Sequence, residues 1–136
     1  MIIAEIGSVH DGSFGNALHL IALASKCGAD AVKFQTHIAE AETLHNAPNP
    51  DYFNEESRFD YFKRTSFSIE QWRQLKKKAE ECNVAFISSP FSIEAVDLLE
   101  KVDVQGYKVP SGEVTNIPLL EKNHSLIDMA FQPKEM

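Results

Sequence analysis

Short apolar runs that alternate with longer helical patterns constrain the fold of this chain more than any other feature. Four runs of strand length lie at residues 2–6, 31–34, 84–87 and 107–109. Patterns with helical spacing separate these runs. The β-α-β order predicts an α/β fold with a parallel sheet, because parallel neighbours need a long crossover connection. A doubly wound sheet and part of a (β/α) barrel both fit this pattern.

Local signals mark the ends of the expected helices. The candidate N-caps carry hydroxyl groups that can accept a backbone N–H bond: Ser13, Ser68 and Ser92. Gln71 completes a candidate capping box, and Phe67 with Trp72 completes a hydrophobic staple. Gly28 suits the left-handed residue that ends the first helix. A third helix is expected over residues 93–99, and a fourth begins near Asn116.

The connection over residues 36–67 is longer than a compact α/β unit needs. It carries a group of aromatic residues: Tyr52, Phe53, Phe59, Tyr61 and Phe62. One interpretation is a loop that packs these rings onto the edge of the sheet. The other is a functional element, either a substrate lid or a subunit contact. The sequence leaves both interpretations open.

Charge and composition exclude several classes of protein. The formal charge is −7, so we expect no general nucleic-acid binding, which needs a basic face. No apolar run approaches the roughly 20 residues of a membrane span. Two cysteines are too few for a disulfide framework. With no sign of a signal peptide, we expect a cytoplasmic protein without membrane partners.

Polar side chains stand at the end of each expected strand. The set comprises Glu5, Lys33, Gln35, Ser89, Lys108, Ser111 and Glu113. Ligands of parallel α/β folds bind at the carboxyl ends of the strands, so we expect these side chains to converge at one rim. Two lysines inside apolar strands need partners. Those partners are either the nearby carboxylates or the phosphate or carboxylate of a small anionic ligand.

Histidines give a weaker signal for a metal site. His10, His37 and His45, together with Glu40, could suggest metal binding because histidine is the commonest ligand. No pair of them has a recognised ligand spacing on one element. We therefore predict no metal site within this chain, and His37 could instead point into the rim beside Gln35.

Four segments at the strand ends together resemble one enzyme family. Residues 3–12 (IAEIGSVHDG), 27–35 (CGADAVKFQ), 86–91 (FISSPF) and 107–116 (YKVPSGEVTN) are similar to successive motifs of the sialic acid synthases. That group includes the N-acetylneuraminate, legionaminate and pseudaminate synthases. The resemblance covers about residues 2–122. One departure is Val9, which stands where the family usually has asparagine.

The resemblance implies a TIM barrel with a defined reaction. Phosphoenolpyruvate condenses with an N-acetylated amino sugar, such as N-acetylmannosamine, to give a nonulosonic acid and phosphate. The residues implied to hold phosphoenolpyruvate are Lys33, Ser89, Lys108 and Ser111. Those implied to face the sugar and the reacting carbons as catalytic residues are Glu5, Gln35 and Glu113. The full-length family also uses a divalent metal, Mn²⁺ or Mg²⁺, and forms homodimers.

The chain is too short for a complete TIM barrel. A TIM barrel needs about 250 residues, whereas 136 residues supply about four βα units. We therefore expect residues 1–122 to form the first half of a barrel and residues 123–136 a divergent tail. The family's metal-binding histidines belong to the other half, so this chain alone is expected to bind no metal and to be inactive. Alternatives are another phosphoenolpyruvate-dependent aldol-type synthase and a non-catalytic remnant or assembly partner.

Overall fold

Strands and helices alternate along almost the whole chain. The computed structural model describes residues 1–51 and 56–130. The elements in order are β1 (Ile3–Gly7), α1 (Phe14–Lys26), β2 (Ala31–Thr36), α2 (Ala39–Glu42), α3 (Arg58–Thr65), α4 (Ile69–Glu81), β3 (Ala85–Pro90), α5 (Ile93–Val102), β4 (Gly106–Tyr107), the 3₁₀ turn η1 (Ser111–Glu113) and α6 (Ile117–Ala130).

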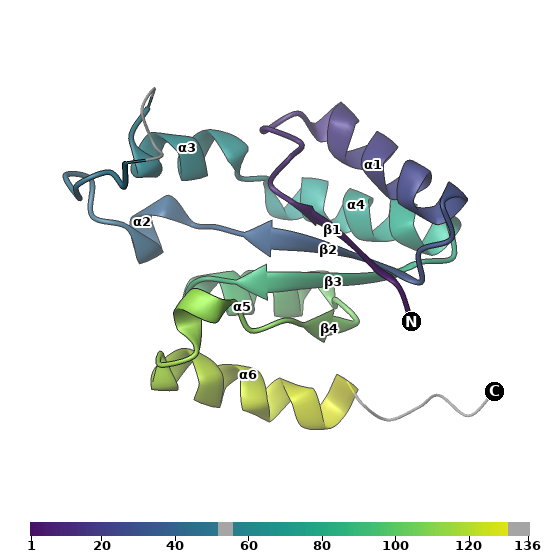
Figure 1. Cartoon of the computed structure of the whole chain (residues 1–136). Helices are drawn as coiled ribbons and strands as arrows, with labels where there is room; N and C mark the ends of the chain where they lie inside the picture. The colour runs from purple at the N-terminus through teal and green to yellow at the C-terminus, as the bar shows by residue number, and fades with distance from the viewer. Residues whose placement is uncertain (52–55, 131–136) are drawn as a thin grey trace.

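The four strands form one parallel sheet in the order β1-β2-β3-β4 (Figure 1). Each strand therefore lies beside the strand that precedes it in the sequence. A doubly wound sheet reverses its strand order at a switch point, whereas a barrel adds its strands consecutively. Of the two folds left open by the sequence, the observed order is that of the barrel.

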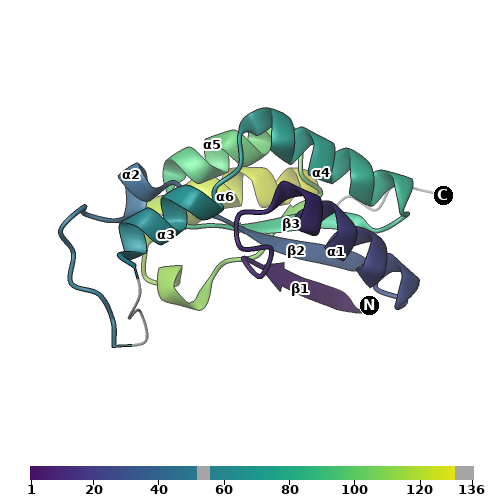
Figure 2. The same cartoon turned by 90° about the horizontal axis from the view of Figure 1, so that it is seen from above.

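The main helices cover one face of this sheet. Figure 2 shows α1, α4, α5 and α6 along the same side of the strands. Residues Val32 and Phe34 of β2 and Phe86 of β3 are fully buried there against α1 and α4. Because side chains alternate along a strand, Lys33 and Gln35 point to the opposite face. In a complete barrel that face lines the interior.

The predicted helix ends are confirmed. Ser13 and Ser92 cap α1 and α5 through their side chains, and Ser68 forms the complete capping box with Gln71 at α4. Gly28 follows α1 with φ of +84°, as a left-handed C-terminal residue should. The rings of Phe67 and Trp72 lie 5.6 Å apart between centroids, so the staple contact is present.

Strand lengths differ from the sequence prediction. β2 and β3 extend to Thr36 and Pro90, beyond their apolar runs, while β4 has only two residues. Gln35 and Ser89 continue the strands on the open side of the sheet, whereas Thr36 and Ser88 lie on the covered side, where their hydroxyl groups bond to each other at 2.7 Å. α6 begins at Ile117, close to the expected start, and runs across the predicted boundary after residue 122.

The long connection contains two short helices, α2 and α3. Phe59 and Phe62 of α3 are buried and pack with Ala39 of α2. These two rings therefore pack within the connection, against α2, and packing onto the edge of the sheet stays a prediction. Tyr52 and Phe53 lie outside the described residues, and a lid or subunit contact stays a prediction.

Candidate functional site

Lys33 is the buried cation at the centre of the predicted rim. Its side chain is only 7% exposed, and its Nζ lies 2.6 Å from Glu5 Oε2. The same Nζ donates to Ser89 Oγ at 3.3 Å. Register explains these contacts, because Glu5 lies opposite Lys33 and the strand β3 brings Ser89 to the same face. Three predicted site residues from three strands are thus in direct contact.

Gln35 lies one residue pair further along the same face. It is opposite Ser89 in the register of β2 and β3. Its Oε1 accepts from Ser8 Oγ at 3.3 Å and lies 3.4 Å from His37 Nε2. Both side chains lie close to Gly7, since a Cβ there would lie 3.9 Å from Gln35 Cδ and 3.3 Å from Glu5 Oε1. The absence of a side chain at Gly7 therefore leaves space for the amide of Gln35 and the carboxylate of Glu5.

The remaining predicted residues follow β4 at the same end of the sheet. Lys108 donates its backbone N–H to Ser88 O at 3.0 Å, and its side chain is exposed. Ser111 is exposed in η1, and Glu113 Oε2 accepts from Asn116 Nδ2 at 2.7 Å. Within the described part of the chain, these three make no hydrogen bond or ion pair to Lys33. The structure therefore brings Glu5, Lys33, Gln35 and Ser89 together. The other three residues lie in the segment after β4 and make no hydrogen bond or ion pair with this group among the described residues.

His10 is buried behind the rim rather than exposed in it. Its ring is 1% exposed and lies 4.6 Å from the Phe67 ring and 6.0 Å from Phe34 between centroids. Its Nδ1 accepts the backbone N–H of Gly12 at 3.1 Å. Burial lowers the pKa of His10, because the charged ring would lose its hydration, and the nearby Asp11 charge opposes this only in part. His10 is thus a neutral packing residue that shapes the loop after β1.

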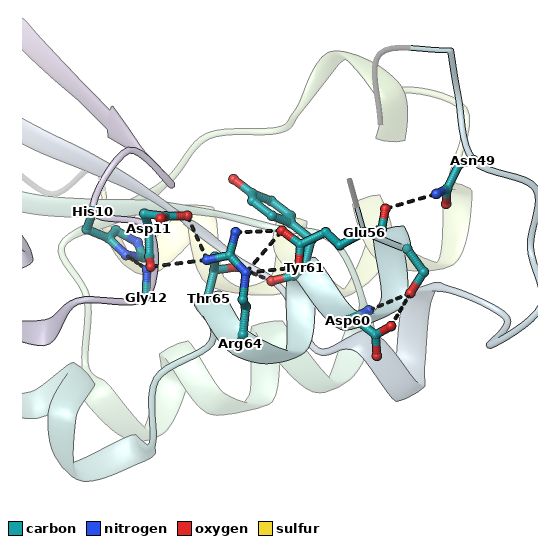
Figure 3. A network of polar contacts seen from close by, with 10 residues as sticks. His10, Asp11, Gly12, Asn49, Glu56, Asp60, Tyr61, Arg64 and Thr65 are labelled. Carbon is teal, nitrogen blue, oxygen red and sulfur yellow. Dashed lines mark hydrogen bonds and ion pairs between the residues drawn. The ribbon is translucent and has the colours of Figure 1, made fainter. Parts of the chain in front are cut away.

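Arg64 joins α3 to that same loop, as Figure 3 shows. Its guanidinium donates to Asp11 Oδ1 at 2.7 Å and to Glu56 Oε2 at 2.9 Å. Gly12 lies against the backbone of α3, where a Cβ would approach Arg64 O to 2.4 Å. Sequence reasoning missed this contact. Asp11 and Arg64 are 53 residues apart, and neither forms part of a periodic pattern that would indicate pairing.

The described residues offer no ligand set for a metal. No group of three or more His, Cys, Asp or Glu side chains among them lies close enough to hold an ion. His10 and His37, two of the histidines considered from sequence, are enclosed by aromatic rings instead. The described helices also include none with the length and apolar character to cross a membrane.

Comparison with known proteins identifies the family. A sequence model described as the NeuB family matches residues 20–128, which is most of the chain. The chain belongs to the NeuB family. Two similar NeuB-family relatives are N,N'-diacetyllegionaminic acid synthase of Campylobacter jejuni and human N-acetylneuraminate-9-phosphate synthase. They are 38% and 36% identical over 127 and 125 residues, covering 90% and 89% of this chain.

Solved structures agree with this assignment. The crystal structure of N-acetylneuraminic acid (sialic acid) synthetase from Leptospira borgpetersenii matches with a TM-score of 0.74 and 30% identity over 89% of this chain. The four-stranded sheet and its helices thus match the first part of a synthetase TIM barrel. The chain spans 38% and 35% of the two synthases and 39% of the synthetase. The resemblance to sialic-acid-type synthases inferred from the four motifs is confirmed.

Proposed function

We propose that this chain supplies the phosphoenolpyruvate-binding side of a sialic-acid-type synthase. In the proposed reaction, phosphoenolpyruvate condenses with an N-acetylated amino sugar such as N-acetylmannosamine. The observation that carries this proposal is the buried Lys33 ammonium at the carboxyl end of β2, in contact with Glu5 and Ser89. Membership of the NeuB family supports it, since the named relatives are synthases of N,N'-diacetyllegionaminic acid and of N-acetylneuraminate 9-phosphate.

The chemistry of phosphoenolpyruvate suits the positive and hydroxyl groups of this rim. The molecule carries a phosphate and a carboxylate, and both accept charge-assisted hydrogen bonds. Lys33 and Lys108 would supply the cations, and Ser89 and Ser111 the hydroxyl donors. An overall charge of −7 makes such a local positive pocket selective for a small anion rather than for a polyanion. On binding, Lys33 would share its N–H donors between Glu5 and the ligand.

The proposed reaction forms one carbon–carbon bond and exchanges the phosphate oxygen on C2 for an oxygen from water. C3 of phosphoenolpyruvate attacks the aldehyde carbon of the open-chain sugar, and the aldehyde oxygen takes up a proton. Water adds at C2 and loses one proton; the bond between C2 and the phosphate oxygen then breaks, and the C2 hydroxyl gives its remaining proton to the departing phosphate as it becomes the ketone. Glu5, Gln35 and Glu113 would face the sugar and the reacting carbons. Glu5 or Glu113 would serve as the group that accepts or returns a proton.

The proposed reaction also involves a divalent metal and a second subunit. The family resemblance implies a divalent metal that would polarise the sugar aldehyde. We assign no residue of this chain to it. We also propose that the full-length protein acts as a homodimer, as the resemblance implies. Both assignments rest on the family and not on a contact seen in this chain.

Titration calorimetry with phosphoenolpyruvate tests the proposal. Lys108→Ala should weaken binding by about ten- to hundredfold, because a hydrogen bond to a charged group is worth about 1.5–3 kcal/mol. Lys77→Ala is the matched control, since Lys77 is an exposed lysine on α4, which covers the other face of the sheet. Equal affinity of the wild type and Lys108→Ala would remove Lys108 from the site. No binding by the folded wild type would overturn the proposed function.

A further inference from the structure

The amide of Gln35 has two possible orientations, and a neighbouring histidine bears on the choice between them. An amide presents either its oxygen or its nitrogen to a ligand, and these differ as acceptor and donor. Here Gln35 Oε1 faces His37 Nε2 at 3.4 Å and accepts from Ser8 Oγ at 3.3 Å. The oxygen is thus occupied by the protein, and the nitrogen is the end that lies near Gly7, 4.0 Å from the position of a Cβ there.

Two phenylalanine rings hold the His37 ring in place. The Phe62 ring stacks on it at 4.0 Å between centroids with an interplanar angle of 8°. The Phe91 ring stacks at 4.1 Å and 22°. These rings come from α3 and from the residue after β3, so two separate parts of the chain clamp the imidazole. Only its two nitrogen-bearing edges remain for polar contacts.

Glu42 fixes the other nitrogen of the ring. Its Oε1 lies 2.5 Å from His37 Nδ1, and both side chains are more than nine-tenths buried. Its second oxygen, Oε2, is buried with no hydrogen-bond partner among the described residues. Rotation of the imidazole by 180° would break the contact with Glu42. The carboxylate therefore sets which ring nitrogen points at Gln35.

Each ring nitrogen of His37 faces one oxygen atom: Nδ1 lies against Glu42 Oε1 and Nε2 against Gln35 Oε1. A ring with a proton on Nε2 donates to Gln35 Oε1, and one proton between Nδ1 and the carboxyl group of Glu42 satisfies the other contact. A ring with a lone pair at Nε2 would favour the opposite orientation, with the nitrogen of Gln35 turned toward His37.

We propose that His37 is a positioning residue that holds the Gln35 amide with its nitrogen toward Gly7, on the open face of the sheet. The Phe62–Phe91 clamp and the Glu42 contact keep its Nε2–H aimed at Gln35 Oε1. Gln35 then offers an N–H donor beside Glu5 and Lys33, and it selects an oxygen acceptor on the ligand, such as a sugar hydroxyl or carbonyl oxygen. This inference deepens the proposed function and rests on it for the role of Gln35.

Nuclear magnetic resonance of the ¹⁵N-labelled 136-residue chain tests the proposal without any substrate. Long-range ¹H–¹⁵N correlations report whether each ring nitrogen carries a proton. We expect a proton on Nε2 of His37. A lone pair at Nε2 in the folded wild type would overturn the proposal. Because no variant is needed, this measurement stands even if substitutions at His37 unfold the protein.

Two substitutions at His37 test its contact with Gln35 separately from its contact with Glu42. The amide nitrogen of His37→Gln can replace Nε2 and that of His37→Asn can replace Nδ1. We expect the Gln35 side-chain amide signals to stay in place in His37→Gln and to move, with faster proton exchange, in His37→Asn. His19→Gln, on the exposed face of α1, is the control. Unmoved Gln35 signals in a folded His37→Asn would contradict the proposal.

Ligand binding distinguishes this inference from the proposed function. If phosphoenolpyruvate and N-acetylmannosamine fail to bind the wild type while His37 Nε2 carries a proton, the proposed function fails and the positioning of Gln35 stands. If both ligands bind and His37→Asn binds the sugar as tightly as the wild type does, Gln35 is not oriented for the ligand by His37, and the inference fails alone.

Discussion

His10 shows how one buried side chain makes stability depend on pH. The ring is enclosed by Phe34 and Phe67, and its Nδ1 accepts a backbone hydrogen bond from Gly12. Both features favour the neutral ring, so the pKa is lowered from its ordinary value of 6.5. An unfolded chain, with the ordinary pKa, binds a proton more readily than the folded one.

Stability should therefore fall as the solution is acidified through the range below pH 6.5. The contribution of the neutral ring is complete above that value and is lost as the pH falls toward the lowered pKa. Urea unfolding from about pH 7.5 to about pH 5.5 measures this loss. His10→Asn keeps an acceptor near Nδ1 but does not titrate. Equal pH dependence in the two proteins would show that His10 titrates normally.

Some residues of the candidate site could be predicted singly from the sequence, and others could not. Lys33 stood out because a cation inside an apolar strand needs a partner. The partner in the structure is Glu5, one of the nearby carboxylates. The pairing of Arg64 with Asp11 had no such signal, because only the folded long connection brings them together. The contact of His37 with Glu42 depends on α2, a helix of four residues that no periodic pattern predicted.

At the scale of elements, the docking of α3 against the loop after β1 depends on one glycine. Gly12 has φ of +80°, and a Cβ there would lie 2.4 Å from the backbone oxygen of Arg64. A side chain would therefore meet both backbone strain and a steric clash with an atom that cannot rotate away. The ion pairs of Arg64 with Asp11 and Glu56 act across the same contact.

Gly12→Ala should lower the free energy of unfolding by at least about 1–2 kcal/mol, the usual penalty of a left-handed backbone for a residue with a Cβ. Gly15→Ala is the matched control, because Gly15 lies in α1 with nothing within 4 Å of its Cβ position. There, alanine should leave stability unchanged or raise it. Urea denaturation compares the two variants. Equal effects would contradict the tight approach of α3 at Gly12.

The elements themselves were largely predictable from the sequence. Periodicity and capping gave the four strands and the helices α1, α4, α5 and the start of α6. The long connection was harder, because α2 and α3 have only four and eight residues and lie beside the prolines Pro48 and Pro50. The ends of β2 and β3 were missed because they are polar: Gln35 and Ser89 face the open side of the sheet, and the buried hydroxyls of Thr36 and Ser88 bond to each other.

At the scale of the whole molecule, four parallel strands form an open sheet with two edges. Within the described residues, β1 and β4 each pair with one strand only. Apolar side chains at β1 are exposed, with Ile2 at 64% and Ile3 at 44%. A complete barrel would pair both edges and fill the open face with side chains from the other strands. The resemblance to relatives more than twice as long accords with this geometry.

The 136-residue chain alone should therefore not complete the synthase reaction. Release of inorganic phosphate from phosphoenolpyruvate with N-acetylmannosamine and Mn²⁺ measures this directly. The Campylobacter jejuni relative, with its own substrate, serves as the positive control for phosphate detection. Turnover on the order of 1 per second or more would show that these residues carry the complete chemistry.

The most direct test of the central claim is a crystal structure of the chain with phosphoenolpyruvate. The proposed function predicts the phosphate or carboxylate of the ligand within hydrogen-bond distance of Lys33 Nζ and Ser89 Oγ, on the face of the sheet that α1 and α4 do not cover. Glu5 and Gln35 should lie beside the reacting carbons. A ligand bound elsewhere, with the contact between Lys33 and Glu5 undisturbed and the rim empty, would contradict the claim.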